Sequence, residues 1–304
     1  MKKYFILLCF CTLFLNSCKN ETKDNGKLNI VTTTSMITDL VKNIGGDAIN
    51  LQGLMGSGVD PHLYKASEGD VSKLVNADII FYNGLHLEGK LVEVFEQMSS
   101  ETKSPIALAD ELDKKGLIGS DYFASNYDPH VWFDIAYFKQ FALKVTEVLS
   151  EQDPENSETY KRNEATYLEE LDKLQDDVKG VVESLPPEKR ILVTAHDAFN
   201  YFGEAYKFKV VGLQGLSTAT EAGVKDVQKL SAFIIENKIK AIFVESSVPR
   251  RTIEALQEAV KSKGHDVEIG GTLFSDALGN EGTPEGTYIG MFRYNIKTIV
   301  SALQ

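Results

Sequence analysis

From residue 28 onward, short apolar runs alternate with stretches in which apolar residues recur every three or four positions. The short runs, rich in Val and Ile, are typical of buried parallel strands, and the periodic stretches are typical of helices with one buried face. This alternation predicts an α/β fold of two lobes, each with a mostly parallel sheet flanked by helices. The expected strands are 29–33, 50–54, 77–82, 105–109, 190–194, 209–213, 241–245 and 266–270, and the expected helices are 36–44, 67–75, 90–98, 198–206, 224–237, 249–263 and 284–303.

Between the two halves, residues 156–185 carry one uninterrupted helical pattern. Pro154 precedes it and Pro186-Pro187 follow it, as expected of helix boundaries. About thirty residues at ~1.5 Å each would span roughly 45 Å, so we predict one rigid helix joining an N-terminal lobe (28–153) to a C-terminal lobe (188–304), with 154–187 as the link. The alternative is a helix lying on a single ordinary domain. The apolar positions are Tyr160, Tyr167, Leu168, Leu171, Leu174, Val178, Val181, Val182 and Leu185.

The N-terminus has the pattern of an export signal. Lys2 and Lys3 precede an apolar run over 4–15 that is too short for an ordinary membrane-spanning helix. The run ends in Leu-Asn-Ser-Cys18, which resembles a bacterial lipobox. We therefore predict a signal peptide over 1–17, a lipid on Cys18 that anchors the exported protein to a membrane of the cell envelope, and a polar tether over 18–27. The alternative is a plain cleaved signal peptide.

Composition narrows the class of protein. The 304 residues are 43% apolar and 25% charged, which is ordinary globular material with enough apolar surface for two cores. All three cysteines lie within the first 18 residues, so the body of the chain can form no disulfide or thiolate cluster. A net charge of -12 argues against nucleic acid as a partner and is compatible with a cationic ligand.

Three of the five histidines have informative settings. Asp-Pro-His followed by an aromatic residue two positions later occurs at both His62 and His130, and the proline restricts the backbone that carries each imidazole. His196 follows the apolar run 191–195, and ligand sites of open α/β sheets lie at the carboxyl ends of strands. Asp276 follows the predicted strand 266–270 through a short loop, although by itself it could equally cap a helix or turn. We expect His86 to pack or hydrogen-bond, and His265 to face solvent in a turn.

Two ligands from each half would form a set of three nitrogens and one carboxylate between the lobes. This set suits Zn²⁺ best and Mn²⁺ as a second choice. A catalytic zinc ion usually keeps one position open for water, whereas four protein donors close the site. The sequence thus predicts capture of one metal ion and no enzymatic reaction.

Carboxylates commonly orient metal-binding imidazoles through the free ring nitrogen. Glu245 is the first candidate because it ends the predicted strand 241–245, although it could also cap or pair with the helix that begins near Pro249. The other acidic candidates are Asp60, Asp128, Asp134 and Asp197.

These residues belong to segments that resemble a known family. Over essentially its whole mature length, the chain is similar to the metal-binding lipoproteins of bacterial ABC importers for zinc and manganese, and most closely to the TroA-type subgroup. The segments that carry the resemblance are 58–62, 78–85, 128–132, 194–199, 243–247 and 273–276. The resemblance puts the family's four metal ligands on the same four residues, His62, His130, His196 and Asp276. It implies a solute-binding protein with a rigid linking helix, a membrane permease and a cytoplasmic ATPase as partners.

The resemblance also bears on metal preference. Manganese-type relatives commonly have Glu at the third ligand position, so His196 favours a site for zinc that also accepts manganese. Zinc-specialised relatives commonly carry a His-rich loop before the second histidine, and residues 111–128 contain no histidine. Three alternative functions are a zinc-dependent hydrolase in the same compartment, with Glu245 or Asp197 as base, an adhesin-type surface lipoprotein, and a receptor for a metal chelate or siderophore. The last of these would need a basic or aromatic crevice instead of a His-rich one.

Overall fold

The computed structural model describes residues 26–101, 104–120 and 123–304. The predicted signal peptide, Cys18 and all but the last two residues of the predicted tether lie outside these residues. Within the described part of the chain, no helix combines the length and the apolar character that crossing a membrane requires.

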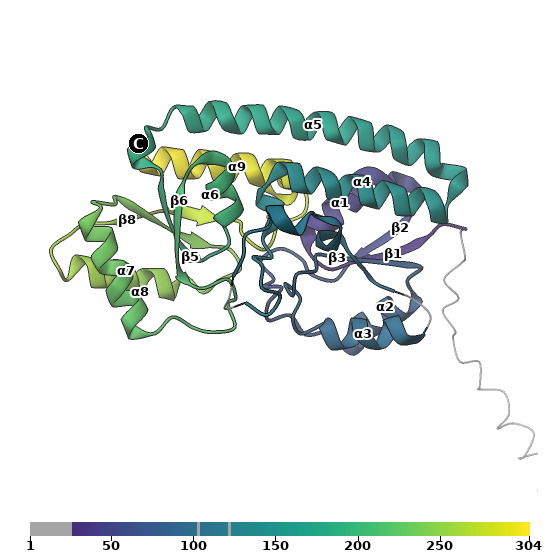
Figure 1. Cartoon of the computed structure of the whole chain (residues 1–304), viewed down its shortest axis with the longest axis horizontal. Coiled ribbons are helices and arrows are strands. Elements are labelled where there is room, and N and C mark those ends of the chain that lie inside the picture. Colours follow the sequence, from purple (N-terminus) through teal and green to yellow (C-terminus); the bar gives the residue numbers. More distant parts are fainter. Residues whose placement is uncertain (1–25, 102–103, 121–122) are drawn as a thin grey trace, which may run out of the picture.

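The first lobe is built on a four-stranded parallel sheet (Figure 1). Its strands are β1 (Asn29–Thr32), β2 (Asn50–Gly53), β3 (Ile79–Tyr82) and β4 (Ile106–Ala107), in the order β2-β1-β3-β4. Because successive strand residues face opposite sides, Ile30 and Phe81 pack towards α1 (Ser35–Gly45) and α4 (Ile135–Gln152). Val31 and Ile80 pack towards α2 (Glu68–Asn76) and α3 (Val92–Glu101) on the other side. The predicted strands and helices of this half are present, with ends shifted by up to a few residues.

The second lobe repeats this plan with two parallel strand pairs. β5 (Ile191–His196) pairs with β6 (Lys209–Gln214), β7 (Ala241–Glu245) pairs with β8 (Glu268–Leu273), and β5 lies next to β7. The helices α6 (Asn200–Tyr206) and α9 (Tyr288–Leu303) cover one side, whereas α7 (Val224–Glu236) and α8 (Arg251–Lys261) cover the other. The carboxyl ends of β5, β7 and β8 therefore reach the junction with the first lobe.

A single long helix, α5 (Ser157–Glu183), runs along both lobes (Figure 1). Its 27 residues span about 40 Å, and it packs on α1 and α4 of the first lobe and on α9 of the second. The predicted apolar stripe is its buried face, although Val181 lies at the edge and is 36% exposed. The predicted helix joining two lobes is thus confirmed.

The helix α4 has no counterpart among the elements predicted from the sequence. It begins after Asp134, whose carboxylate accepts a hydrogen bond from the backbone N–H of Ala136 at 2.8 Å. An aspartate before an apolar run with helical spacing is a typical helix start, so the signal was available. The buried positions are Ile135, Phe138, Phe141, Ala142, Val145, Thr146, Val148 and Leu149.

The main apolar core belongs to both lobes. One cluster includes Leu40 of α1, Phe138 of α4, Leu174 of α5 and Phe292 of α9. The ring of Phe138 stacks on that of Tyr288 with centroids 3.7 Å apart, which joins the helices of the two lobes directly. Smaller clusters lie on the far side of each sheet. The largest core is thus shared between the two lobes, which joins them into one packed body.

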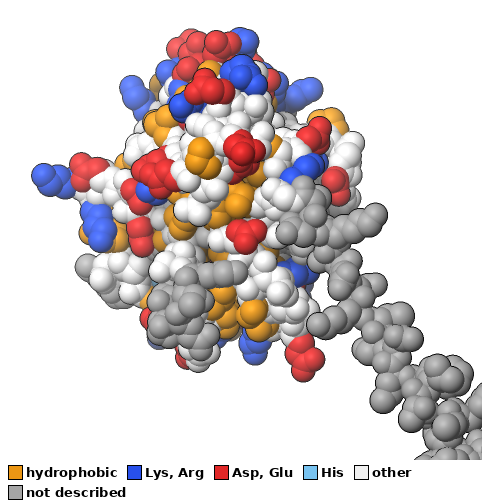
Figure 2. Space-filling model, turned by 90° about the vertical axis from the view of Figure 1, so that its right-hand side faces the viewer, with side chains coloured by type: hydrophobic (Ala, Val, Ile, Leu, Met, Phe, Trp, Pro, Cys, Tyr) orange, Lys and Arg blue, Asp and Glu red, His pale blue; other side chains and the backbone are white. Residues whose placement is uncertain are grey.

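The surface carries charged side chains of both signs. Figure 2 shows the molecule from the end of the first lobe, with acidic and basic side chains interspersed over the part drawn in colour. No continuous basic patch is visible on that part of the surface.

Candidate metal centre

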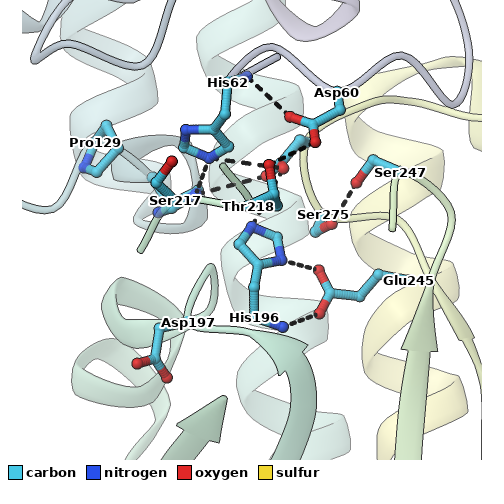
Figure 3. Close-up of polar contacts among 12 residues, drawn as sticks. Asp60, His62, Pro129, His196, Asp197, Ser217, Thr218, Glu245, Ser247 and Ser275 are labelled. Atoms are coloured by element: carbon cyan, nitrogen blue, oxygen red, sulfur yellow. Dashed lines mark hydrogen bonds and ion pairs between the residues drawn. The ribbon is translucent and has the colours of Figure 1, made fainter. Parts of the chain in front are cut away.

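Four side chains from distant parts of the chain meet at the junction of the lobes (Figure 3). His62 lies on the loop between β2 and α2, and His130 immediately precedes the 3-10 turn Val131–Phe133. His196 is the last residue of β5, and Asp276 lies just after β8. One possible ligand atom from each residue lies within 4.8 Å of the others. The sequence placed these four residues together, two from each lobe, and the structure brings them together.

The four groups are positioned to share one cation. The Nε2 atoms of His62 and His130 are 3.3 Å apart, and those of His196 and His130 lie 3.2 and 3.6 Å from carboxylate oxygens of Asp276. The four residues are 0–4% exposed. Neither oxygen of Asp276 has a donor in hydrogen-bonding geometry within the described residues. A buried carboxylate without such a donor is unfavourable, and a divalent cation at this point would satisfy it.

Two of the three imidazoles are held by a carboxylate at the opposite ring nitrogen. Asp128 Oδ1 lies 2.7 Å from His130 Nδ1 and also accepts the His130 backbone N–H at 2.9 Å. Glu245 places Oε2 at 2.6 Å from His196 Nδ1, and its Oε1 accepts the His196 backbone N–H at 2.8 Å. Each carboxylate therefore fixes both the ring and the backbone of its histidine, which leaves Nε2 facing the centre.

The other three acidic candidates have different places. Asp60 accepts the backbone N–H of His62 at 2.9 Å and the hydroxyl of Thr218 at 2.5 Å, so it acts on the backbone of His62 rather than on its ring. Asp134 caps α4, and Asp197 accepts the backbone N–H of Gly212 at 2.6 Å with its carboxylate turned away from His196 (Figure 3). The expectation that Asp134 and Asp197 orient the imidazoles is therefore corrected.

Burial and the charges of neighbouring side chains shift the pKa values of the residues in the centre. Burial lowers the pKa of His62 to about 3, so its ring is neutral. Burial also disfavours the charged form of His196, but the carboxylates of Glu245 and Asp276 raise its pKa well above the ordinary value. For Asp276, burial acts to raise the pKa, and the imidazoles of His196, His130 and His62 outweigh it and hold the pKa below its usual range. Without metal, the centre therefore keeps a proton on His196.

Buried hydrogen bonds across the lobes support the loops that carry the ligands. Trp132 donates its indole N–H to the carbonyl oxygen of Ser275 at 3.1 Å, and Tyr288 donates its hydroxyl to the carbonyl oxygen of Trp132 at 2.6 Å. Tyr201 donates to the carbonyl oxygen of Asp128 at 3.0 Å. In the sequence, Trp132 stands out only as the aromatic residue after His130, and neither tyrosine stands out, since contacts between distant segments leave no local signal.

The two remaining histidines are outside the centre. His86 is exposed, has a left-handed backbone (φ 64°), and contacts the ring of Phe123 edge-on with centroids 6.2 Å apart. His265 is half-buried, with Nε2 3.1 Å from the carbonyl oxygen of Ile239, instead of facing solvent as expected.

Comparison with known proteins adds independent evidence. Residues 30–302 match the family described as zinc-uptake complex component A, periplasmic. The zinc-binding protein TroA of Treponema pallidum is 47% identical over 97% of this chain and 98% of its own. The manganese-binding lipoprotein MntA of Bacillus subtilis is 45% identical over 97% of each chain.

Solved structures are similar over most of the chain. The periplasmic zinc-binding protein TroA from Treponema pallidum superimposes with a TM-score of 0.89 at 49% identity, covering 91% of this chain and 99% of that one. A manganese-bound periplasmic metal-binding protein from Candidatus Liberibacter asiaticus gives a TM-score of 0.78 at 26% identity, covering 91% and 100% of the two chains.

Proposed function

This chain belongs to the family of zinc-uptake complex component A, periplasmic, and on that premise we propose that it is an extracytoplasmic solute-binding protein. It captures one divalent transition metal ion between its lobes, through His62, His130, His196 and Asp276, and delivers the ion to an ABC permease that is driven by an ATPase.

The observation that carries this proposal is the closed, buried donor set. One possible ligand atom from each of the four residues lies within 4.8 Å of the others, and none of the four residues is more than 4% exposed. A hydrolytic zinc site needs an open coordination position and room for a substrate beside it. The closed centre therefore supports capture and release of the ion over hydrolysis.

The donor chemistry supports zinc first and manganese second. Imidazole nitrogens favour zinc, and the carboxylate is acceptable to both ions. The two relatives named above differ in the same way, since one is described as zinc-binding and the other as manganese-binding.

A lipid on Cys18 would hold the exported protein at the membrane beside its permease. The sequence motif supports this anchor, and the Bacillus subtilis relative is described as a lipoprotein. Replacing Cys18 with Ala should move the protein from the membrane fraction to the soluble extracytoplasmic fraction, and an unchanged distribution would contradict the anchor.

The central test is a zinc titration of the exported chain after removal of metal. Binding at a free concentration of 100 Kd should stabilise the folded state by about 2.7 kcal/mol and raise Tm accordingly. Asp276→Asn should lose most of this stabilisation. Asp134→Asn removes the same charge at a helix cap that Asn also serves well, so it should keep the full response. Equal zinc affinity in the Asp276→Asn and unmodified chains would contradict the proposed ligand set.

A further inference from the structure

The three imidazoles are not held equally. Carboxylates contact the Nδ1 atoms of His130 and His196, whereas no residue in the described ranges offers a hydrogen-bond or ion-pair partner to His62 Nδ1. The carboxylate nearest to it in sequence, Asp60, engages only the backbone N–H of His62. His62 is also the most exposed of the four, at 4% against 0–1%. The ring of His62 is therefore the least restrained of the proposed donors.

The loop that carries His62 is attached to the second lobe near its middle. Its start is tied to the first lobe, where Leu54 and Met55 donate backbone N–H groups to the carbonyl oxygens of Thr32 and Thr33. Further along, Asp60 Oδ2 accepts the hydroxyl of Thr218 from the second lobe at 2.5 Å (Figure 3). This contact joins two segments 158 residues apart in the sequence.

Thr218 belongs to the segment 215–222, which follows β6 and borders a cavity of about 400 Å³. Towards its ends, the carbonyl oxygen of Gly215 accepts the backbone N–H of Asp197, that of Thr220 accepts the side chain of Gln214, and the carboxylate of Glu221 lies 3.5 Å from the guanidinium of Arg251. Between these ends, within the part of the chain that the structure describes, Thr218 alone makes a hydrogen bond to another segment. Its side chain is buried (7% exposed), so water is poorly placed to replace this bond.

We propose that Thr218 is a positioning residue that controls how fast the metal ion leaves. Its hydroxyl holds Asp60, Asp60 holds the backbone of His62, and His62 is the donor that must move first because it has the fewest restraints. A closed four-donor site cannot release its ion until one donor withdraws. The bridge between Thr218 and Asp60 therefore adds to the barrier for release. This inference rests on the proposed function of the centre.

The test compares release rates of loaded proteins. The exported chain is loaded with Zn²⁺, mixed with excess EDTA, and followed by stopped flow with a zinc indicator. Thr218→Val removes the hydroxyl at nearly constant volume, and we expect release about tenfold faster, which corresponds to ~1.4 kcal/mol for a hydrogen bond to a charged group. Thr218→Ser retains the hydroxyl and should release at close to the original rate.

Two further variants make the outcome decisive. Thr220→Val changes an exposed threonine of the same segment and should leave the rate unchanged. Asp60→Asn weakens the same bridge from the other side and should also speed release, and combining it with Thr218→Val should add little, since both act on one interaction. Should the valine variant not fold, Asp60→Asn carries the test. Unchanged release from Thr218→Val, or from Asp60→Asn in that case, overturns the role of the bridge while the metal centre stands. Failure of the unmodified chain to bind zinc at all overturns both proposals.

Discussion

Glu245 contacts His196 through both carboxylate oxygens: one lies 2.6 Å from the ring Nδ1, and the other accepts the backbone N–H at 2.8 Å. Both residues end neighbouring strands, β7 and β5, so the sheet itself sets the spacing between them. The carboxylate orients the imidazole and increases the basicity of Nε2, the atom that faces the proposed metal position.

Removing this carboxylate should weaken metal binding without changing the four donors. Glu245→Gln should lower zinc affinity by about 10- to 100-fold, measured by competition with a chelator of known affinity. Asp197→Asn is the matched control, because Asp197 contacts the backbone of Gly212 and not an imidazole. Similar losses in both variants would show that general charge, and not the orientation of His196, determines affinity.

Metal binding should release a proton from His196. Its pKa is raised well above the ordinary value by Glu245 and Asp276, so the ring is protonated near neutral pH, whereas a metal ion needs the neutral ring. Lowering the pH favours the protonated ring and so weakens binding, and affinity should rise with pH until the raised pKa is passed. Calorimetric zinc titrations at pH 7 in buffers of different ionisation enthalpy should report about one proton released per ion. Heats that do not depend on the buffer would rule this out.

The hydrogen bond from Tyr288 to the carbonyl oxygen of Trp132 should contribute to stability. Both residues are buried, so Tyr288→Phe leaves that carbonyl without its donor and should reduce the free energy of unfolding by about 1–3 kcal/mol. Tyr294→Phe, on the same helix but half-buried against Phe274, should change it by less than about 0.5 kcal/mol. Urea denaturation of the metal-free proteins measures both, and equal values would argue against a special role for the Tyr288 hydroxyl.

Truncating side chains on the buried face of α5 should lower the free energy of unfolding much more than truncating side chains at the edge of that face. Leu174 is fully buried in the shared core, and Leu174→Ala should reduce the free energy of unfolding by about 2–5 kcal/mol. Val181 is 36% exposed on the same helix, and Val181→Ala should cost less than about 1 kcal/mol. Comparable losses in the two variants, measured by the same denaturation, would contradict the assigned face.

Much of the fold could be predicted because the relevant signals are local. Strand runs, the periodic stripe of α5 and its flanking prolines are all visible within short windows of sequence. The helix α4 has the same kind of signal, with Asp134 as its N-cap, although it is not among the helices predicted above. Without the helix, its N-cap aspartate resembled a carboxylate that orients a nearby ligand.

The candidate centre was predictable for a different reason. The repeated Asp-Pro-His motif and the position of His196 at a strand end pointed to ligands, and the family resemblance selected the same set. What supports those ligands from a distance was not predictable. Tyr201, Thr218 and Tyr288 reach their partners from segments more than 70 residues away, and a single sequence contains no record of such pairings.

The core shared between the lobes limits how an occupied molecule can differ from an empty one. Swinging the halves widely apart would expose Phe138 and Tyr288 to water and bend α5, and both changes are unfavourable. The metal-bound and metal-free proteins must then differ by small rearrangements of the loops around the centre. A transporter that distinguishes the two forms therefore has to recognise the local shape and charge of that surface, and not a change in the shape of the whole molecule.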